Sequence, residues 1–269
     1  PIFFASGQNN KNKKGFMDIY ESKKEEFLQR FEKMSDLSVR EFCCGRLRIC
    51  IFYISNFCSK NMIAEQIINP LSAAYGREGN AFSVESSIAS ASLSILGSGD
   101  EAEESLLAGS AVLMYDGSPR YALSVGTKNE EGRSGNEPDT ENVIRGPHEG
   151  FTENGESNAM LIRRRLHTAK LKKLNFSVGT LSKTDVSIMY IEGIAREKLV
   201  FEVVRRIKNT DVATVTDSGM IELCIQDGKY ALFPTVGNSE RPDKVAAKLT
   251  EGRVAIIVDG SPVVLTVPY

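Results

Sequence analysis

The chain has 269 residues, of which 41% are apolar and 25% are charged, and it contains no Trp. This is the composition of a folded protein with a hydrophobic core, and it excludes a wholly disordered chain. The net charge of −2 predicts no general attraction to nucleic acid or to anionic lipid, and no apolar run approaches the ~20 residues that cross a bilayer.

The first half predicts helices alternating with strands. Residues 5–15 are rich in Asn, Lys and Gly, and we expect a mobile N-terminal segment over residues 1–16. Residues 17–34 show helical spacing of apolar side chains, Leu47–Ile54 is rich in β-branched and aromatic residues typical of a buried strand, and a second helical pattern runs up to Pro70. A helix over 100–107 and two strands around the Asp116-Gly117 turn complete this half.

The second half repeats this order after a glycine-containing polar linker. Strand 186–191 precedes helix 197–207, and helix 242–249 precedes strands 253–258 and 263–267. The segment 109–119 matches 252–262 at five of eleven positions, including the Asp-Gly-Ser-Pro turn. The Tyr-Ile pair at 53–54 recurs at 190–191, each time at the end of a strand that a helix follows. Self-similarity in order, type and spacing predicts a duplicated unit.

The predicted fold class is therefore α/β, with two similar α/β subdomains, each a sheet with flanking helices. We expect a first subdomain at 17–126, a linker and connecting Arg-rich helix at 127–174, and a second subdomain at 175–269. The segment 145–166 is predicted to lie outside both copies. The apolar end of the sequence suggests that a longer protein has been cut.

The residues that carry most enzyme chemistry are scarce. His148 and His167 are the two histidines, and no nucleophile elbow, phosphate-binding loop or dinucleotide fingerprint occurs. The five cysteines lack the paired spacing of a disulfide framework or a zinc site. We therefore predict a protein that is not an enzyme and has neither a cofactor nor a metal.

The most unusual stretch follows the linker and supplies most candidate site residues. Gly146-Pro147 and Gly150 predict a turn, and Thr152 is a possible cap for the helix that carries three arginines. On a helix, adjacent side chains diverge by ~100°, so Arg163 and Arg165 should flank the apolar stripe while Arg164 points away. The candidates for ligand binding or interdomain coupling here are Arg145, Glu149, Thr152, Asn158, Arg163 and Arg165.

Two interpretations of the flanking arginines stay open. In the first, they tie the helix to carboxylates on the two subdomains. In the second, they bind an anionic group. Glu240, Arg241 and Asp259 are further candidates, although a helix start at 239–243 and a hairpin turn account for these residues equally well.

Together these motifs resemble one family over about residues 17–269: the cytoplasmic N-terminal domain of the A subunit of nutrient germinant receptors from endospore-forming bacteria. The resemblance rests on the stretches 145–153 (RGPHEGFTE), Asn158, 162–166 (IRRRL), 178–179 (VG), 190–192 (YIE), 233–235 (FPT), 240–243 (ERPD) and 252–262. His148 and Ser261 depart from the residues that are commoner in the family.

The resemblance implies that the full protein continues past residue 269 into a membrane domain. It also implies that the present chain is a soluble domain, on the spore-core side, of a protein in the spore inner membrane. It also implies B and C subunits as partners and a role in the nutrient sensing and signal transduction that trigger germination. The nutrient would be an amino acid, a sugar or a nucleoside. The alternative is a structural module that assembles the receptor complex, with ligand recognition elsewhere.

Overall fold

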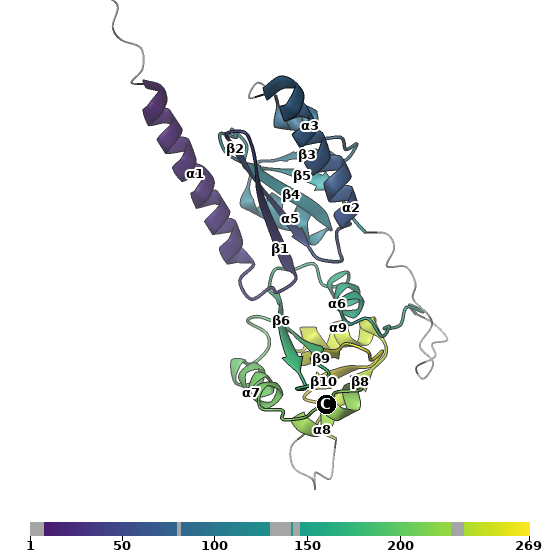
Figure 1. Cartoon of the computed structure of the whole chain (residues 1–269). Coiled ribbons are helices and arrows are strands. Elements are labelled where there is room, and N and C mark those ends of the chain that lie inside the picture. Colours follow the sequence, from purple (N-terminus) through teal and green to yellow (C-terminus); the bar gives the residue numbers. More distant parts are fainter. Residues whose placement is uncertain (1–7, 80–81, 130–140, 142–145, 227–233) are drawn as a thin grey trace, which may run out of the picture. The chain divides into compact units, whose positions relative to one another are not determined.

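A computed structural model describes residues 8–79, 82–129, 141, 146–226 and 234–269. The chain divides into two compact units. The first consists of Pro1–Glu32 and Asp36–Asn129, and the second of Lys33–Ser35 and Glu130–Tyr269. Each unit contains one five-stranded sheet with helices packed on it, as Figure 1 shows, so the expected α/β class is confirmed.

The first unit is an antiparallel sheet in the order β1-β2-β4-β5-β3. Its strands are β1 (Leu37–Cys44), β2 (Leu47–Ile54), β3 (Leu93–Leu96), β4 (Ser110–Tyr115) and β5 (Ala122–Gly126). Its helices are α1 (Gln8–Arg30), α2 (Lys60–Ile63), a π-helix (Ala64–Ile68), α3 (Asn69–Glu78), α4 (Val84–Ser87) and α5 (Gly99–Leu107).

The second unit is an antiparallel sheet in the order β6-β7-β9-β10-β8. Its strands are β6 (Leu171–Val178), β7 (Thr184–Ile191), β8 (Gly237–Ser239), β9 (Val254–Val258) and β10 (Val264–Val267). Its helices are α6 (Gly155–Arg163), α7 (Glu197–Lys208), α8 (Ser218–Ile225) and α9 (Pro242–Thr250).

The two sheets have the same strand order, and their central strand pairs have the same register. Ile51 pairs with Leu113 in the first unit, and Ile188 pairs with Ile256 in the second. These residues occupy the same places relative to the repeated Tyr-Ile and Asp-Gly-Ser-Pro motifs. The duplication read from the sequence is therefore present in the backbone pairing.

Each sheet buries both faces. In the first unit, one face packs against α2, α3 and α4, and the other packs against α5 and α1. In the second unit, α7 and α8 cover one face, and α6 and α9 cover the other. Strands that are buried on both faces have continuous apolar runs, and such runs in the sequence predict β2 and β7.

Helix α6 occupies the place in the second unit that α1 occupies in the first. The ring of Phe27 on α1 lies 5.0 Å from that of Phe52 on β2. On the corresponding strand β7, Met189 packs in one buried cluster with Ile162 of α6. The expectation that residues 145–166 lie outside both copies is therefore wrong for the helix, whose position is repeated although its sequence is not.

One predicted helix end is also wrong, because the helical segment continues beyond Pro70. The π-helix Ala64–Ile68 ends just before α3, and Pro70 stands in the first turn of that helix. Proline has no amide hydrogen, so the continuous helical segment lacks one backbone hydrogen bond at this position. None of the helices in the described ranges is both long and apolar enough to span a bilayer.

Candidate functional site

The loop before α6 is held by side chains that bond to its own backbone. Asn154 is the N-cap of α6, and its Oδ1 accepts a hydrogen bond of 2.8 Å from Ser157 N. The Oγ1 atom of Thr152 accepts one of 3.2 Å from Asn154 N. The cap is therefore Asn154, and the expectation that Thr152 caps the helix is wrong by two residues.

Asn158 is fully buried beneath this loop. Its Oδ1 accepts a hydrogen bond of 2.8 Å from Thr152 N, and its Nδ2 donates one of 2.6 Å to Thr152 O. The amide thus pairs with the backbone of Thr152 as a strand neighbour would. A buried amide satisfied in this way fixes the loop on the helix.

Asp259 connects the β9–β10 turn to the start of α6. Its Oδ1 accepts a hydrogen bond of 2.9 Å from Gly155 N, and Gly260 N donates one of 2.7 Å to Glu153 O. A Cβ atom on Gly155 would lie 3.3 Å from that carboxylate oxygen. A negative charge at a helix N-terminus is favourable, so Asp259 has a structural role here.

The three arginines do not diverge as expected. Helix α6 ends at Arg163, so Arg164 and Arg165 lie in the following turn. Arg165 Nη1 lies 2.7 Å from Glu149 Oε2, and Arg164 Nη1 lies 3.8 Å from Glu149 Oε1. The prediction that Arg164 points away is therefore wrong, because ideal helix geometry no longer applies at the helix end.

Arg163 is 1% exposed and donates a hydrogen bond of 3.3 Å to Leu171 O at the start of β6. The structure therefore gives Arg163 a backbone partner within its own unit, and it pairs Arg165 with a carboxylate of the same segment.

The remaining predicted residues lie near the start of α9. Glu240 O accepts a hydrogen bond of 2.8 Å from Phe151 N. Arg241 makes two hydrogen bonds to Asp243, of 3.0 and 2.5 Å. Burial raises the pKa of Asp243, but its hydrogen bond and charge interaction with Arg241 outweigh burial and hold that pKa below its ordinary value. Arg145 lies outside the described residues.

Two buried lysines on β6 are not among the residues predicted from the sequence. Lys173 is fully buried, and its Nζ lies 2.6 Å from Glu156 Oε1 of α6. Lys172 Nζ lies 3.5 Å from Glu192 Oε2, and Lys33 Nζ lies 3.3 Å from Glu192 Oε1. Burial raises the pKa of Glu192, but the two lysines lower it below its usual value. These contacts connect Lys33 and β6 to Glu192, the residue that follows β7.

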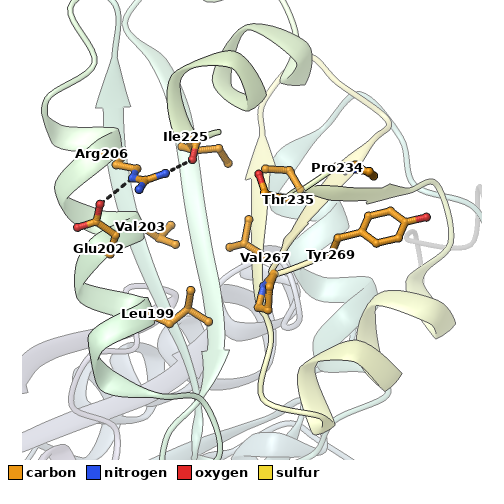
Figure 2. Close-up of a pocket in the computed structure, with 11 residues that line it drawn as sticks. Leu199, Glu202, Val203, Arg206, Ile225, Pro234, Thr235, Val267 and Tyr269 are labelled. Carbon is orange, nitrogen blue, oxygen red and sulfur yellow. Dashed lines mark hydrogen bonds and ion pairs between the residues drawn. The ribbon is translucent and has the colours of Figure 1, made fainter. Parts of the chain in front are cut away.

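A cleft of about 410 Å³ opens beside α7 in the second unit, and Figure 2 shows its walls. Leu199 and Val203 line it from α7, and Val267 and Tyr269 line it from the end of β10. At its rim, Arg206 Nε donates a hydrogen bond of 2.7 Å to Glu202, whose pKa is lowered to about 2 by Arg205 and Arg206. This cleft is mainly apolar, and none of the predicted site residues lines it.

The contacts found for the predicted site residues are structural. Among them, no group of three or more His, Cys, Asp or Glu side chains is placed to hold a metal ion. Of the predicted residues, the structure brings together Glu149 with Arg165 and Thr152 with Asn158. Asp259 bonds separately to Gly155 N at the N-terminus of α6, and every one of these contacts lies within the second unit.

A known protein family and several known proteins are similar to this chain in sequence. The model of the Bacillus/Clostridium GerA spore germination protein family matches residues 25–269. Spore germination protein KA of Bacillus subtilis (strain 168) is 35% identical over 257 residues, which is 93% of this chain and 46% of that protein. Spore germination protein A1 of the same organism is 43% identical over 166 residues, or 61% of this chain and 34% of that protein.

A solved structure is similar over nearly the whole chain. It is the N-terminal domain of the A subunit of the Bacillus megaterium spore germinant receptor GerK3, with a TM-score of 0.62 and 30% identity. The match covers 90% of this chain and 91% of that one. The chain spans about half the length of spore germination protein KA. It belongs to the GerA family of spore germination proteins, in which it corresponds to the N-terminal domain of a germinant-receptor A subunit.

Proposed function

We propose that this chain contributes to nutrient sensing and signal transduction in spore germination, and that it acts through protein contacts without catalysis. Its partners are the B and C subunits of the same receptor, and the nutrient is an amino acid, a sugar or a nucleoside. The full-length protein lies in the spore inner membrane, with this domain on the side of the spore core.

One observation supports this proposal. The polar side chains in the loop before α6 and at the end of that helix form their hydrogen bonds and ion pairs with other residues of the second unit. Glu149 is paired with Arg165, and Asn158 with the backbone of Thr152. A catalytic or anion-binding site needs its charged groups directed at a ligand. Groups that instead lock a loop to a helix suit an element that transmits a change of position.

The test is nutrient-dependent germination of spores that carry Arg165→Ala in the full-length protein. We expect germination to slow while the purified domain keeps the circular dichroism spectrum of the wild type. The matched control is Arg205→Ala, which removes an arginine that is paired with Glu202 on the exposed face of α7. Normal germination of the Arg165→Ala spores would contradict the proposal.

A second candidate function is assembly of the receptor complex, with the nutrient recognised elsewhere. It is favoured by two large apolar side chains on the surface of the second unit, Phe201 on α7 and Leu223 on α8, which are 71% and 74% exposed. Exposed side chains of this kind, where they cluster, mark protein interfaces.

Two titrations of the domain separate these functions. Saturable chemical-shift changes on addition of a germinant favour sensing by this domain. Binding to another receptor subunit that Phe201→Ser weakens, without any response to the germinant, favours assembly.

A further inference from the structure

Asn154 and Gly155 form the only Asn-Gly pair in the sequence. In such a pair, the main-chain nitrogen of the glycine can attack the side-chain amide carbon of the asparagine. Glycine allows this attack because it has no Cβ to hinder the approach and its backbone adopts many conformations. Asparagine is for this reason among the chemically labile residues of proteins. The pair at the start of α6 is therefore a candidate for covalent modification.

The modification has two steps. In the first, a bond forms between Gly155 N and Asn154 Cγ while the bond from Cγ to Nδ2 breaks. Ammonia leaves with the proton that Gly155 N has lost, and a cyclic imide remains. In the second, water adds to one of the two ring carbonyls and opens the ring to aspartate or isoaspartate. One water molecule is consumed and one ammonia is released, and the reaction needs no oxidant or reductant.

The structure leaves Asn154 open to water but restrains the attacking nitrogen. Asn154 is exposed at the surface, whereas Gly155 is buried. Gly155 N donates a hydrogen bond of 2.9 Å to Asp259 Oδ1, on the turn between β9 and β10. The step that the fold can control is therefore the attack by Gly155 N, which comes before the addition of water.

The fold also requires the glycine that makes Asn154 labile. A Cβ atom at position 155 would lie 3.3 Å from Asp259 Oδ1 and 3.4 Å from Asp259 Cα. A side chain there would press on the main chain of the β9–β10 turn. Glycine at position 155 thus serves the close approach of Asp259, and the Asn-Gly pair is the chemical consequence.

Asp259 opposes the attack in two ways. Gly155 N must first give up its hydrogen bond, and a bond to a carboxylate is among the stronger ones in proteins. It must also lose its proton, and the negative charge of the carboxylate disfavours the negative charge that would then develop on the nitrogen. A second contact keeps the turn in place, because Gly260 N donates a hydrogen bond of 2.7 Å to Glu153 O.

The amide of Asn154 is restrained by the cap of α6. Its Oδ1 accepts the hydrogen bond of 2.8 Å from Ser157 N. Ring closure takes the side chain out of this cap. Isoaspartate then adds one carbon atom to the main chain between positions 154 and 155, so the hydrogen bonds that join the loop to the helix lose their spacing.

We propose that Asn154 is a deamidation site and that Asp259 sets the rate at which it converts. While Asp259 is bound to Gly155 N, the Asn-Gly pair is preserved. When the β9–β10 turn moves away from α6, Asn154 converts to aspartate and isoaspartate. The conversion is irreversible, so it accumulates each time the contact opens.

The test is the rate of conversion in the purified chain, with wild type and Asp259→Ala incubated side by side at mildly alkaline pH. Protease digestion and mass spectrometry measure aspartate and isoaspartate in the peptide that contains residue 154. We expect conversion about tenfold faster, or faster still, in Asp259→Ala. Asp259→Asn keeps an acceptor without the charge and should convert at an intermediate rate. Equal rates in wild type and Asp259→Ala overturn the proposal.

Two control variants separate the contact from a general loosening of the chain. Asp116→Ala removes the counterpart of Asp259 in the first unit and should leave the rate unchanged. Thr152→Val removes the hydroxyl that accepts from Asn154 N, but it leaves the bond between Gly155 and Asp259. We expect this variant to convert at nearly the wild-type rate.

Conversion of Thr152→Val as fast as that of Asp259→Ala overturns the proposal, because the mobility of the loop then sets the rate. Circular dichroism shows whether Asp259→Ala keeps the wild-type fold. If it does not, Asp259→Asn takes its place in the comparison, and a rate equal to that of the wild type overturns the proposal.

Discussion

Polar side chains that bond to the backbone hold the loop before α6 in place. Asn158 satisfies both backbone groups of Thr152, and Asp259 satisfies the amide of Gly155. Such contacts add little net stability while they are intact, but they are costly to break, because the partner left behind stays buried without a hydrogen bond.

Asn158→Ala should therefore destabilise the domain. The substitution leaves the N–H and C=O of Thr152 unpaired beneath the loop, and we expect a loss of about 2–4 kcal/mol in the free energy of unfolding. Chemical denaturation measures it. Asn238→Ala, at an exposed position of β8, is the control and should change stability by less than about 0.5 kcal/mol. Equal effects of the two variants would show that the amide has no such role.

The Arg241–Asp243 pair should make stability depend on pH. Arg241 holds the pKa of Asp243 below its ordinary value in the folded protein, although burial opposes this shift. A carboxyl with a depressed folded pKa contributes stability above its unfolded pKa of about 3.9, and this contribution is lost as the pH falls through the folded pKa. Asp243→Asn should therefore be less stable than the wild type at neutral pH, with a difference that shrinks in acid. A difference that does not vary with pH would contradict this assignment.

The repeated elements share local requirements as well as topology. Gly109 and Gly252 each end the turn between a helix and a strand with a positive φ. A Cβ on Gly252 would lie 3.0 Å from Ile194 O. The glycine is therefore needed in both copies for its backbone conformation, and in the second copy also for the close approach of the chain.

Replacing two glycines with alanine should have opposite effects. Gly252→Ala should lower the free energy of unfolding by about 1–2 kcal/mol, because it places a side chain in the left-handed region. Gly76→Ala lies in α3 with open space around it and should raise that free energy by about 0.5–1 kcal/mol. Thermal unfolding of the two variants measures both changes. Destabilisation by both would mean that Gly76 is constrained in some other way.

Much of the fold was readable from local pattern. Strand β2 was predicted with its observed bounds, Leu47–Ile54, and the two Asp-Gly turns located the β4–β5 and β9–β10 hairpins. These features depend on neighbours in sequence, namely β-branched runs and turn residues that need a positive φ. The duplication followed because both copies keep these local signals.

The parts that the sequence did not reveal depend on contacts distant in the chain. Strand β6 carries Lys172 and Lys173, which look like surface residues but are buried by contacts from elsewhere in the chain. Lys173 N donates to Lys33 O, and Ser35 N donates to Lys173 O, so three residues from before β1 cover this edge. The sequence also did not reveal that α1 and α6 occupy the same place in their units. The two helices pack on their sheets with different side chains, so their sequences are not similar.

At the scale of the whole molecule, we propose that the Glu149–Arg165 contact of the second unit serves structure and coupling, with no direct role in anion binding. Exchange of the two charges tests this proposal. Arg165→Glu places two carboxylates together and should slow nutrient-dependent germination, and Glu149→Arg should do the same.

The decisive measurement is germination of spores that carry both substitutions, Glu149→Arg with Arg165→Glu. The double variant restores an ion pair in reversed order, so we predict germination faster than in either single variant and close to the wild type. Arg164, whose Nη1 lies 3.8 Å from Glu149 Oε1, is present in all of these proteins and serves as a constant background. Germination of the double variant that is as slow as in Arg165→Glu alone would contradict the account, because the positive charge at Arg165 would then be needed for something other than Glu149.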